Sequence, residues 1–409
     1  MIAAMRFIVT LLVCLMVAAG APSGASADAA FDRFLESLWP RAQQLGVSRG
    51  VFEAAIAGLE PDYSLPDLAI PGRPEKAPPG QPEFVQTPGQ YLREQSFNRL
   101  AARGRKLSAQ YRDTLARIEK EFGVPGDVVL AVWARETDYG GYRLPHDGIR
   151  VLATQAYVGK RKDMFQVEFL YALKLLQDGT PRADLRSSWG GALGLTQFLP
   201  SEIYKHGVDF DGDGRADIVR SVPDALASAA RQLQSKGWRA GERWAYEVRA
   251  PKNADCSIGT PDVTMPLAEW LRRGFVPADG RPLGATELAL EASLLQPEGR
   301  YGPSFLTPKN YYVIKDYNFS DLYVLFVGHL ADRIAGRGPF ATPWGKEKQL
   351  RTAEVEAMQR RLAALGLYKD KIDGKAGMLT RAALGQYQKA NGLVVDCWPT
   401  AAVLAHMWR

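Results

Sequence analysis

The chain has 409 residues, of which 46% are hydrophobic and 23% charged, and its formal net charge is +6 at pH 7. This length exceeds one small domain and allows a sizeable core, so we expect two or three domains. The modest positive charge suits an anionic partner such as a cell-wall polymer, whereas the lack of a basic stripe with interleaved aromatics argues against nucleic-acid binding.

The first 27 residues have the pattern of a secretory signal peptide. Arg6 precedes the apolar run 7–19, and residues 25–27 give the A-x-A form of a cleavage site. Because the apolar run is too short to span a membrane, we expect a periplasmic protein that is not embedded in a membrane.

Two cysteines remain outside that segment, Cys256 and Cys397, and we expect them in different domains. Disulfides persist in exported proteins, so a bridge would pin the two domains together. Two unrelated buried thiols are the alternative, because spacing alone does not fix the geometry. Four histidines and the absence of a CxxC motif argue against a zinc site.

Helical periodicity dominates the first half of the chain. Residues 31–59 predict two helices broken near Gly46, and residues 91–122 and 151–176 predict further helices. The proline-rich stretch 61–88 predicts an extended segment over the surface, with a disordered linker as the alternative.

Residues 122–140 predict a short buried helix. Pro125 suits a first helical turn, residues 128–134 are apolar without a helix breaker, and Gly140 with Gly141 marks the end. The side chains of this stretch are therefore expected to lie in the core.

Glu136 is the acid in the second half of this helix and shares a face with Val129 and Val132. Loss of hydration disfavours the anion, so we expect a carboxyl group that holds its proton near neutral pH and acts as a general acid. An ordinary solvated glutamate is the alternative. Flat aromatic faces for a sugar ring are offered by Trp133, Tyr139 and Tyr142.

Asp138 is the nearest second acid, but two residues along a helix correspond to about 200° of rotation. Its side chain is therefore expected to point away from Glu136, so the sequence does not predict the paired carboxylates of a typical glycosidase.

The glycine-rich stretch 187–201 allows close approach of a ligand to the backbone, and Gln197 offers a donor and an acceptor to sugar amides or hydroxyls. A tight turn between core helices is the alternative.

An aspartate-rich loop follows and resembles the start of a calcium-binding loop, with oxygen ligands at alternate positions and a glycine at the sixth. Arg220 replaces the usual glutamate at position twelve. We expect structural calcium or sodium there, with an unliganded turn as the alternative. The predicted ligands are Asp209, Asp211, Asp213, Arg215 and Asp224.

The second half of the chain predicts a helix over 222–236, short strands within 244–276, a β-prone segment at 311–317 and a helix over 322–330. Glycines, prolines and charges predict an interdomain linker, placed at 339–349. Residues 350–409 have the pattern of a small three-helix domain, and their size suggests a binding module.

Together these motifs resemble the lytic murein transglycosylases of the B type. The matching segments are 123–140, the QPEF motif at 81–84, 152–154, 191–201 and the aromatic segment 311–318. The tail resembles the peptidoglycan-binding domain family. The resemblance implies a mainly α (α+β) fold with a lysozyme-like catalytic domain (28–338) that has a small β element, followed by a peptidoglycan-binding domain (350–409).

By this resemblance Glu136 is the single catalytic acid/base, and no cofactor is required for the chemistry. Substrate contacts are expected from Ser188, Gln197, Phe198, Tyr139, Tyr312 and Tyr317. The expected partners are peptidoglycan glycan strands, and cell-wall synthesis or secretion machinery is a further expectation.

The implied reaction cleaves the bond between N-acetylmuramic acid and N-acetylglucosamine and closes a 1,6-anhydro ring on the muramyl sugar. A lysozyme-type muramidase, which needs a second acid, and a non-catalytic wall-binding scaffold are the two rival hypotheses.

Overall fold

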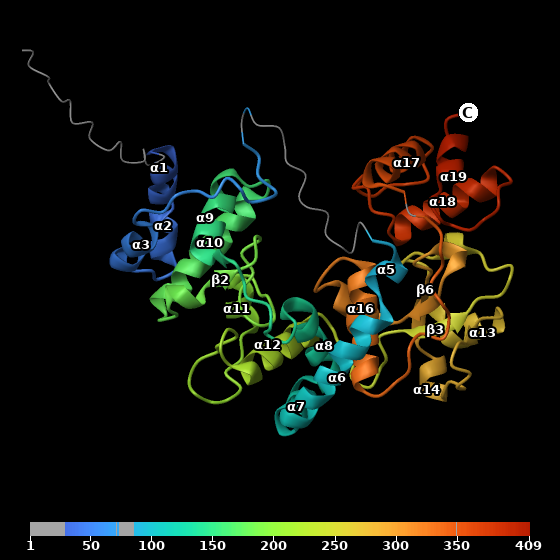
Figure 1. The fold of residues 1–409 in the computed structure, drawn as a ribbon, viewed down its shortest axis with the longest axis horizontal. Coiled ribbons are helices and arrows are strands. Elements are labelled where there is room, and N and C mark those ends of the chain that lie inside the picture. The colour runs from blue at the N-terminus through green and yellow to red at the C-terminus, as the bar shows by residue number, and fades with distance from the viewer. Residues whose placement is uncertain (1–28, 71, 73–85, 349) are drawn as a thin grey trace, which may run out of the picture.

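The computed structural model describes residues 29–70, 72, 86–348 and 350–409. The predicted signal peptide and the QPEF motif lie outside the described residues. The described chain is mostly helical with two small sheets, which confirms the predicted fold class (Figure 1). Among its helices, none combines the length and the apolar character needed to cross a membrane.

A first group of helices packs around one core and lies at the blue and green end of the molecule in Figure 1. Residues 31–59 form three helices rather than the two predicted, because a second break falls at Leu38, before the proline in the first turn of α2. The helices are α1 (Ala29–Ser37), α2 (Trp39–Gln44), α3 (Arg49–Ile56), α9 (Gly148–Val158) and α10 (Lys162–Gln177).

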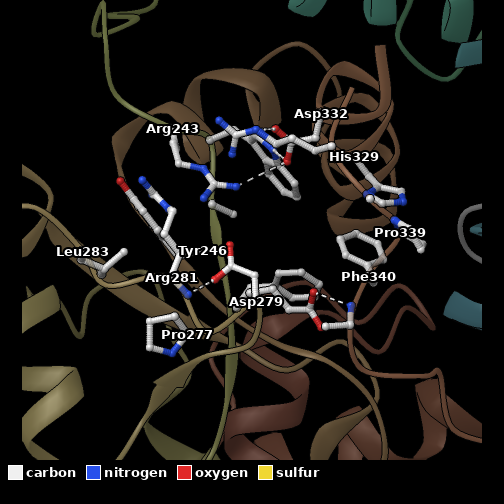
Figure 2. Close-up of a pocket in the computed structure, with 17 residues that line it drawn as sticks. Arg243, Tyr246, Pro277, Asp279, Arg281, Leu283, His329, Asp332, Pro339 and Phe340 are labelled. Carbon is white, nitrogen blue, oxygen red and sulfur yellow. Dashed lines mark hydrogen bonds and ion pairs between the residues drawn. The ribbon is translucent and has the colours of Figure 1, made fainter. Parts of the chain in front are cut away.

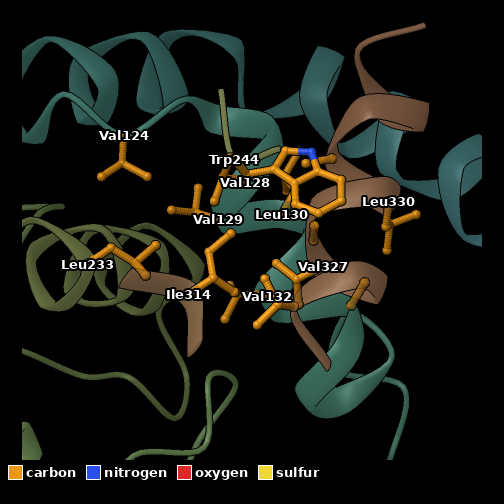
Figure 3. Packing of buried hydrophobic residues seen from close by; sticks show 14 of the residues in the cluster. Val124, Val128, Val129, Leu130, Val132, Leu233, Trp244, Ile314, Val327 and Leu330 are labelled. Carbon is orange, nitrogen blue, oxygen red and sulfur yellow. The ribbon is translucent and has the colours of Figure 1, made fainter. Parts of the chain in front are cut away.

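A second, larger core surrounds α8 and contains the valines and leucines drawn in Figure 3. Helix α8 packs against α6 and α16, and α12 covers α7 and α8. The elements of this region are α5 (Pro88–Tyr91), α6 (Glu94–Gln110), α7 (Arg112–Phe122), α8 (Gly126–Thr137), α12 (Val222–Ser235), α15 (Lys309–Lys315) and α16 (Asp321–Ile334). Helix α11 (Pro200–His206) packs against α10 and α12 and contributes Ile203 to the first core.

An antiparallel five-stranded sheet in the order β4-β6-β7-β3-β5 closes one side of this core. Tyr246 pairs with Leu306, which in turn pairs with Leu294, so apolar side chains line up across the sheet. The strands are β3 (Tyr246–Arg249), β4 (Met265–Pro266), β5 (Val276–Pro277), β6 (Glu291–Leu295) and β7 (Ser304–Thr307).

Short elements complete the part of the chain that precedes the C-terminal domain. A two-stranded sheet joins β1 (His146–Asp147) to β2 (Arg186–Ser187). The remaining pieces are η1 (Arg182–Asp184), η2 (Cys256–Ile258), α13 (Leu267–Arg272), α14 (Ala285–Leu288) and η3 (Gly299–Tyr301).

The C-terminal domain consists of α17 (Thr352–Ala364), α18 (Met378–Ala390) and α19 (Ala401–His406), which confirms the three predicted helices (Figure 1). A disulfide joins Cys397 of this domain to Cys256 in η2. The segment before α17 lies against strand β3, because Glu247 accepts hydrogen bonds from the backbone of Ala341 and Thr342.

Candidate active site

Helix α8 carries Glu136 at the edge of the larger core. Val129 and Val132 on the same face are fully buried, whereas Glu136 is half-buried. The helix ends at Thr137 rather than at the predicted glycines, because Asp138 (φ 49°) and Tyr139 (φ 54°) adopt left-handed backbone conformations. Such conformations are unfavourable for residues other than glycine, so strain is concentrated directly after Glu136.

Tyr323 on α16 donates its hydroxyl to Glu136 Oε1 at 2.5 Å. The Tyr323 ring stacks on Tyr317, with ring centroids 6.3 Å apart and an interplanar angle of 10°. Burial, and then the charge of Glu136, raise the pKa of both phenols well above the ordinary value. Both hydroxyls therefore remain protonated and act as donors over the whole accessible pH range.

The glycine-rich segment 187–198 is pinned beside Glu136 by two hydroxyl groups. Thr137 donates to Leu195 O at 2.7 Å, and Tyr317 donates to Thr196 O at 2.6 Å. Gly191 has φ +80°, and a Cβ there would lie 2.2 Å from Leu152 Cδ2. A side chain at this position would therefore push the segment away from its support.

Gln197 and Ser188 both belong to this segment and are half-buried. Gln197 has φ 55°, and its side-chain amide donates to Gly194 O at 3.0 Å. Ser188 Oγ accepts from Ala192 N at 3.2 Å. The segment thus holds both predicted contact residues in local turns, and Gln197 directly follows Thr196, whose carbonyl oxygen accepts from Tyr317.

Two predicted aromatic contacts, Tyr139 and Phe198, lie elsewhere than expected. Tyr139 and Phe198 are only 3% and 2% exposed and pack in the two hydrophobic cores, so they support the site from behind rather than offer a face to a sugar. Tyr139 donates its hydroxyl to Leu100 O at 3.0 Å. Tyr312 is half-buried beside β7, where its hydroxyl lies 3.3 Å from Thr307 Oγ1.

Asp138 is paired with two arginines of α6, at 3.2 Å from Arg99 and 3.8 Å from Arg103. Its carboxylate is therefore engaged in ion pairs, and its separation from Glu136 stays a prediction.

The aspartate-rich loop gathers three exposed carboxylates. Oxygens of Asp209, Asp211 and Asp213 all lie within 4.8 Å of one another. Hard cations such as calcium prefer this set of oxygen donors, so the three residues fit such an ion.

Asp224, predicted as a fourth ligand, has a different role. Its carboxylate is fully buried and accepts backbone N–H groups from Phe210 at 2.9 Å, Asp211 at 3.2 Å and Asp217 at 2.8 Å. The prediction was wrong because Asp224 anchors the base of the loop instead of facing the exposed cluster. Arg220, at position twelve, pairs with Asp184.

A cavity of about 310 Å³ lies between β3, β5, α16 and the segment before α17 (Figure 2). Its charges compensate one another: Asp332 lies 3.7 Å from Arg243 and 3.5 Å from Arg337. None of the residues that line it belongs to the Glu136 network, so we do not assign the chemistry to this cavity.

Tyr323 and Thr137 were missed by the sequence reasoning. Tyr323 lies in an apolar helix that resembles ordinary core, and its partner Glu136 is 187 residues away in the chain. The available signal was chemical: a buried tyrosine needs a hydrogen-bond partner for its hydroxyl.

The chain matches two known families. The family described as transglycosylase SLT domain matches residues 30–332, and the putative peptidoglycan binding domain matches residues 351–407. Membrane-bound lytic murein transglycosylase B of Escherichia coli (strain K12) is 29% identical over 232 residues, which are 55% of this chain and 61% of the relative. The match therefore spans less than two thirds of that relative.

Two solved structures are also similar. SltB3 from Pseudomonas aeruginosa, in complex with NAG-anhNAM-pentapeptide, shares 35% identity with a TM-score of 0.83, covering 94% of this chain and 100% of that chain. Slt35 of Escherichia coli in complex with calcium shares 27% identity with a TM-score of 0.52, covering 61% and 80% respectively.

Proposed function

Because the chain belongs to the family of transglycosylase SLT domains, we propose that it is a peptidoglycan lytic transglycosylase with Glu136 as its single acid/base. The reaction cleaves the β-1,4 bond between N-acetylmuramic acid and N-acetylglucosamine without water. The observation that carries the assignment is the arrangement around Glu136. The Tyr323 hydroxyl donates to the Glu136 carboxyl group, whereas the Asp138 carboxylate forms ion pairs with two arginines.

In the first step Glu136 donates its proton to the glycosidic oxygen, and the substrate's own acetamido carbonyl stabilises the sugar cation. The Tyr323 hydroxyl donates to Oε1 of this carboxyl group. The same phenol then stabilises the carboxylate that forms, because a hydrogen bond to an ionised acceptor is stronger than one to a neutral acceptor.

In the second step the ionised Glu136 accepts the proton of the muramyl 6-hydroxyl, whose oxygen attacks the anomeric carbon and closes the 1,6-anhydro ring. The nucleophile belongs to the same sugar, so its effective concentration exceeds that of an external water. This explains how one carboxyl group suffices where a hydrolase normally uses two.

We also propose that the substrate contacts Ser188, Gln197 and Tyr317. Two observations support this proposal: Tyr317 stacks on Tyr323, and Thr137 and Tyr317 hydrogen-bond to the segment that contains Ser188 and Gln197. Tyr312 is kept as a more distant contact. The C-terminal domain is proposed to hold the glycan strand, and the signal-peptide pattern supports a periplasmic location.

Structural calcium, or sodium, is proposed at the loop of Asp209, Asp211 and Asp213, with Arg215 supplying a backbone oxygen. The ion would add rigidity to the loop before α12 and would take no part in the proton transfers. The calcium complex of Slt35 supports this proposal.

The test is mass spectrometry of the soluble products after the mature protein digests purified peptidoglycan. Anhydro-muramyl ends are expected, and Glu136→Gln should reduce the rate by about 10²–10⁴-fold, because it removes the proton donor. Asp138→Asn is the matched control: it makes the same change two residues away and should keep the rate within about threefold.

Other products would support the rivals. Reducing ends would mean a muramidase that uses a second carboxylate, and the absence of products from the wild-type protein would favour the binding scaffold. Equal losses in Glu136→Gln and Asp138→Asn would contradict the assigned role of Glu136.

A further inference from the structure

The C-terminal domain contacts the catalytic domain at both ends of α18. Toward the end of α18, Lys389 forms an exposed ion pair with Asp255 at 2.5 Å, close to the disulfide between Cys256 and Cys397. At the start of α18, Met378 is 4% exposed and belongs to the core that surrounds α8 and α16. The second contact therefore reaches the structural support of the active site.

One turn into α18, Arg381 forms a buried ion pair with Asp321 of the catalytic domain. The distance from Arg381 Nη2 to Asp321 Oδ2 is 3.2 Å, and each side chain is 9% exposed. Asp321 Oδ1 accepts from Tyr311 at 2.8 Å and from Lys315 at 2.5 Å. Three donors therefore satisfy this carboxylate, and one of them comes from the other domain.

Asp321 is the first residue of α16, the helix that carries Tyr323. In the same turn the capping residue Ser320 accepts the backbone N–H of Tyr323 at 3.4 Å. Tyr323 in turn donates to Glu136 at 2.5 Å. A shift of this first turn would move the Tyr323 hydroxyl away from the carboxyl group, and such misplacements are costly for catalysis.

We propose that Arg381 is a positioning residue for catalysis: by holding Asp321 it fixes the first turn of α16, and with it the Tyr323 hydroxyl against Glu136. The proposal rests on the function proposed above. It makes the C-terminal domain a structural part of the catalytic centre in addition to a binding module.

The location of the ion pair supports a role beyond docking. At the other end of α18, the contact between the two domains is made by an exposed ion pair. The side chains of Lys389 and Asp255 there are 61% and 32% exposed. Burying a charge pair requires desolvation of both groups, and loss of one partner leaves the other uncompensated. Arg381 and Asp321 nevertheless lie buried, and Asp321 is two positions from Tyr323 in the chain.

The test compares Arg381→Gln, Arg381→Lys and the control Lys389→Gln in the full chain, with kcat and KM measured on a defined four-sugar NAG-NAM strand. A short strand is used because it gives the C-terminal domain little glycan to hold. Arg381→Gln should lower kcat on the order of tenfold with KM within about twofold, and Arg381→Lys should restore most of the loss. Lys389→Gln should leave both constants within about twofold.

A wild-type kcat in Arg381→Gln, or a change confined to KM, would overturn the proposal. Circular dichroism checks that each variant is folded. Should Arg381→Gln fail to fold, the isosteric Asp321→Asn is judged by the same criteria, since it removes the charge that Arg381 holds.

A second measurement does not depend on activity. In protein carrying ¹³C-labelled glutamate, the Glu136 carboxyl signal is identified by its loss in Glu136→Gln and is then titrated. Arg381→Gln should shift this titration and Lys389→Gln should not; an unchanged titration in Arg381→Gln would overturn the proposal. If the wild-type protein gives no products, the proposed function fails while this titration still decides the positioning role.

Discussion

Asp224 and Asp321 are both buried in the first turn of a fourteen-residue helix that begins after a capping serine, yet their carboxyl groups meet different partners. Asp224 accepts three backbone N–H groups, all from the loop that precedes its own helix. Asp321 accepts from a phenol, a lysine and an arginine, and the arginine belongs to another domain.

The partners decide the electrostatics. Burial raises the pKa of Asp224 above the ordinary value in spite of its backbone hydrogen bonds. Burial acts in the same direction on Asp321, but the charges of Lys315 and Arg381 outweigh it and hold the pKa at about 2. Backbone amides thus tie together one local loop, whereas charged side chains join parts of the chain that are far apart in sequence.

The largest effect is expected from Asp224→Ala. Three backbone N–H groups lose their acceptor, and since each buried unsatisfied donor costs about 1–3 kcal/mol, the free energy of unfolding should fall by about 4 kcal/mol. Urea denaturation measures it. The control Asp213→Ala removes an exposed carboxylate that accepts a hydrogen bond from Arg215 N, and it should cost below about 1 kcal/mol. Similar losses in the two variants would show that Asp224 is not the anchor of the loop.

Asp321 is expected to make a smaller, pH-dependent contribution to the free energy of unfolding. Its pKa is 3.8 in the unfolded chain and about 2 in the folded protein, so between these values the unfolded chain binds more protons and acid favours unfolding. The contribution of about 2 kcal/mol is fully present above pH 4 and is lost as the pH falls toward 2. It is measured as the difference in unfolding free energy between the wild-type protein and Asp321→Asn across this range.

Asp224 should show the opposite sign. Its folded-state pKa lies above 3.8, so the folded protein binds the proton more readily, and the stability that this group contributes falls as the pH rises through that window. For each aspartate, the difference in unfolding free energy between the wild-type protein and the Asn variant is plotted against pH. If the plots for Asp224→Asn and Asp321→Asn slope in the same direction, the proposed contrast between the two aspartates is wrong.

The features predicted from the sequence depend on local pattern. The apolar run before Glu136, the glycines of 187–198 and the heptad-like spacing of the C-terminal helices each contain their own signal. The end of the helix that carries Glu136 was predicted at Gly140, because glycine favours positive φ. In the structure Asp138 and Tyr139 already adopt positive φ, so the helix ends earlier.

The features that were missed depend on contacts between distant residues. Residues 311–317 contain β-prone aromatics, but 309–315 form α15 because Tyr311, Val313 and Ile314 find buried positions against the larger core. Arg381 and Asp321 are 60 residues apart in the chain, and nothing in the pattern of either segment identifies the other. The contacts that support Glu136 were therefore less predictable from the sequence than Glu136 itself, the proposed acid/base.

The smallest effect is expected from calcium. The loop carboxylates already accept backbone N–H groups, as in Asp209, which accepts from Gly212 and Gly214 at 2.8 Å each, so the loop is organised without an ion. Calcium at ten times its Kd should add only about 1.4 kcal/mol, seen as a higher Tm that Asp211→Asn abolishes and the distant Asp316→Asn keeps. Sodium at the same concentration tests the alternative ion. A calcium-dependent rise in Tm that persists in Asp211→Asn, or that is lost in Asp316→Asn, would contradict binding of the ion at this loop.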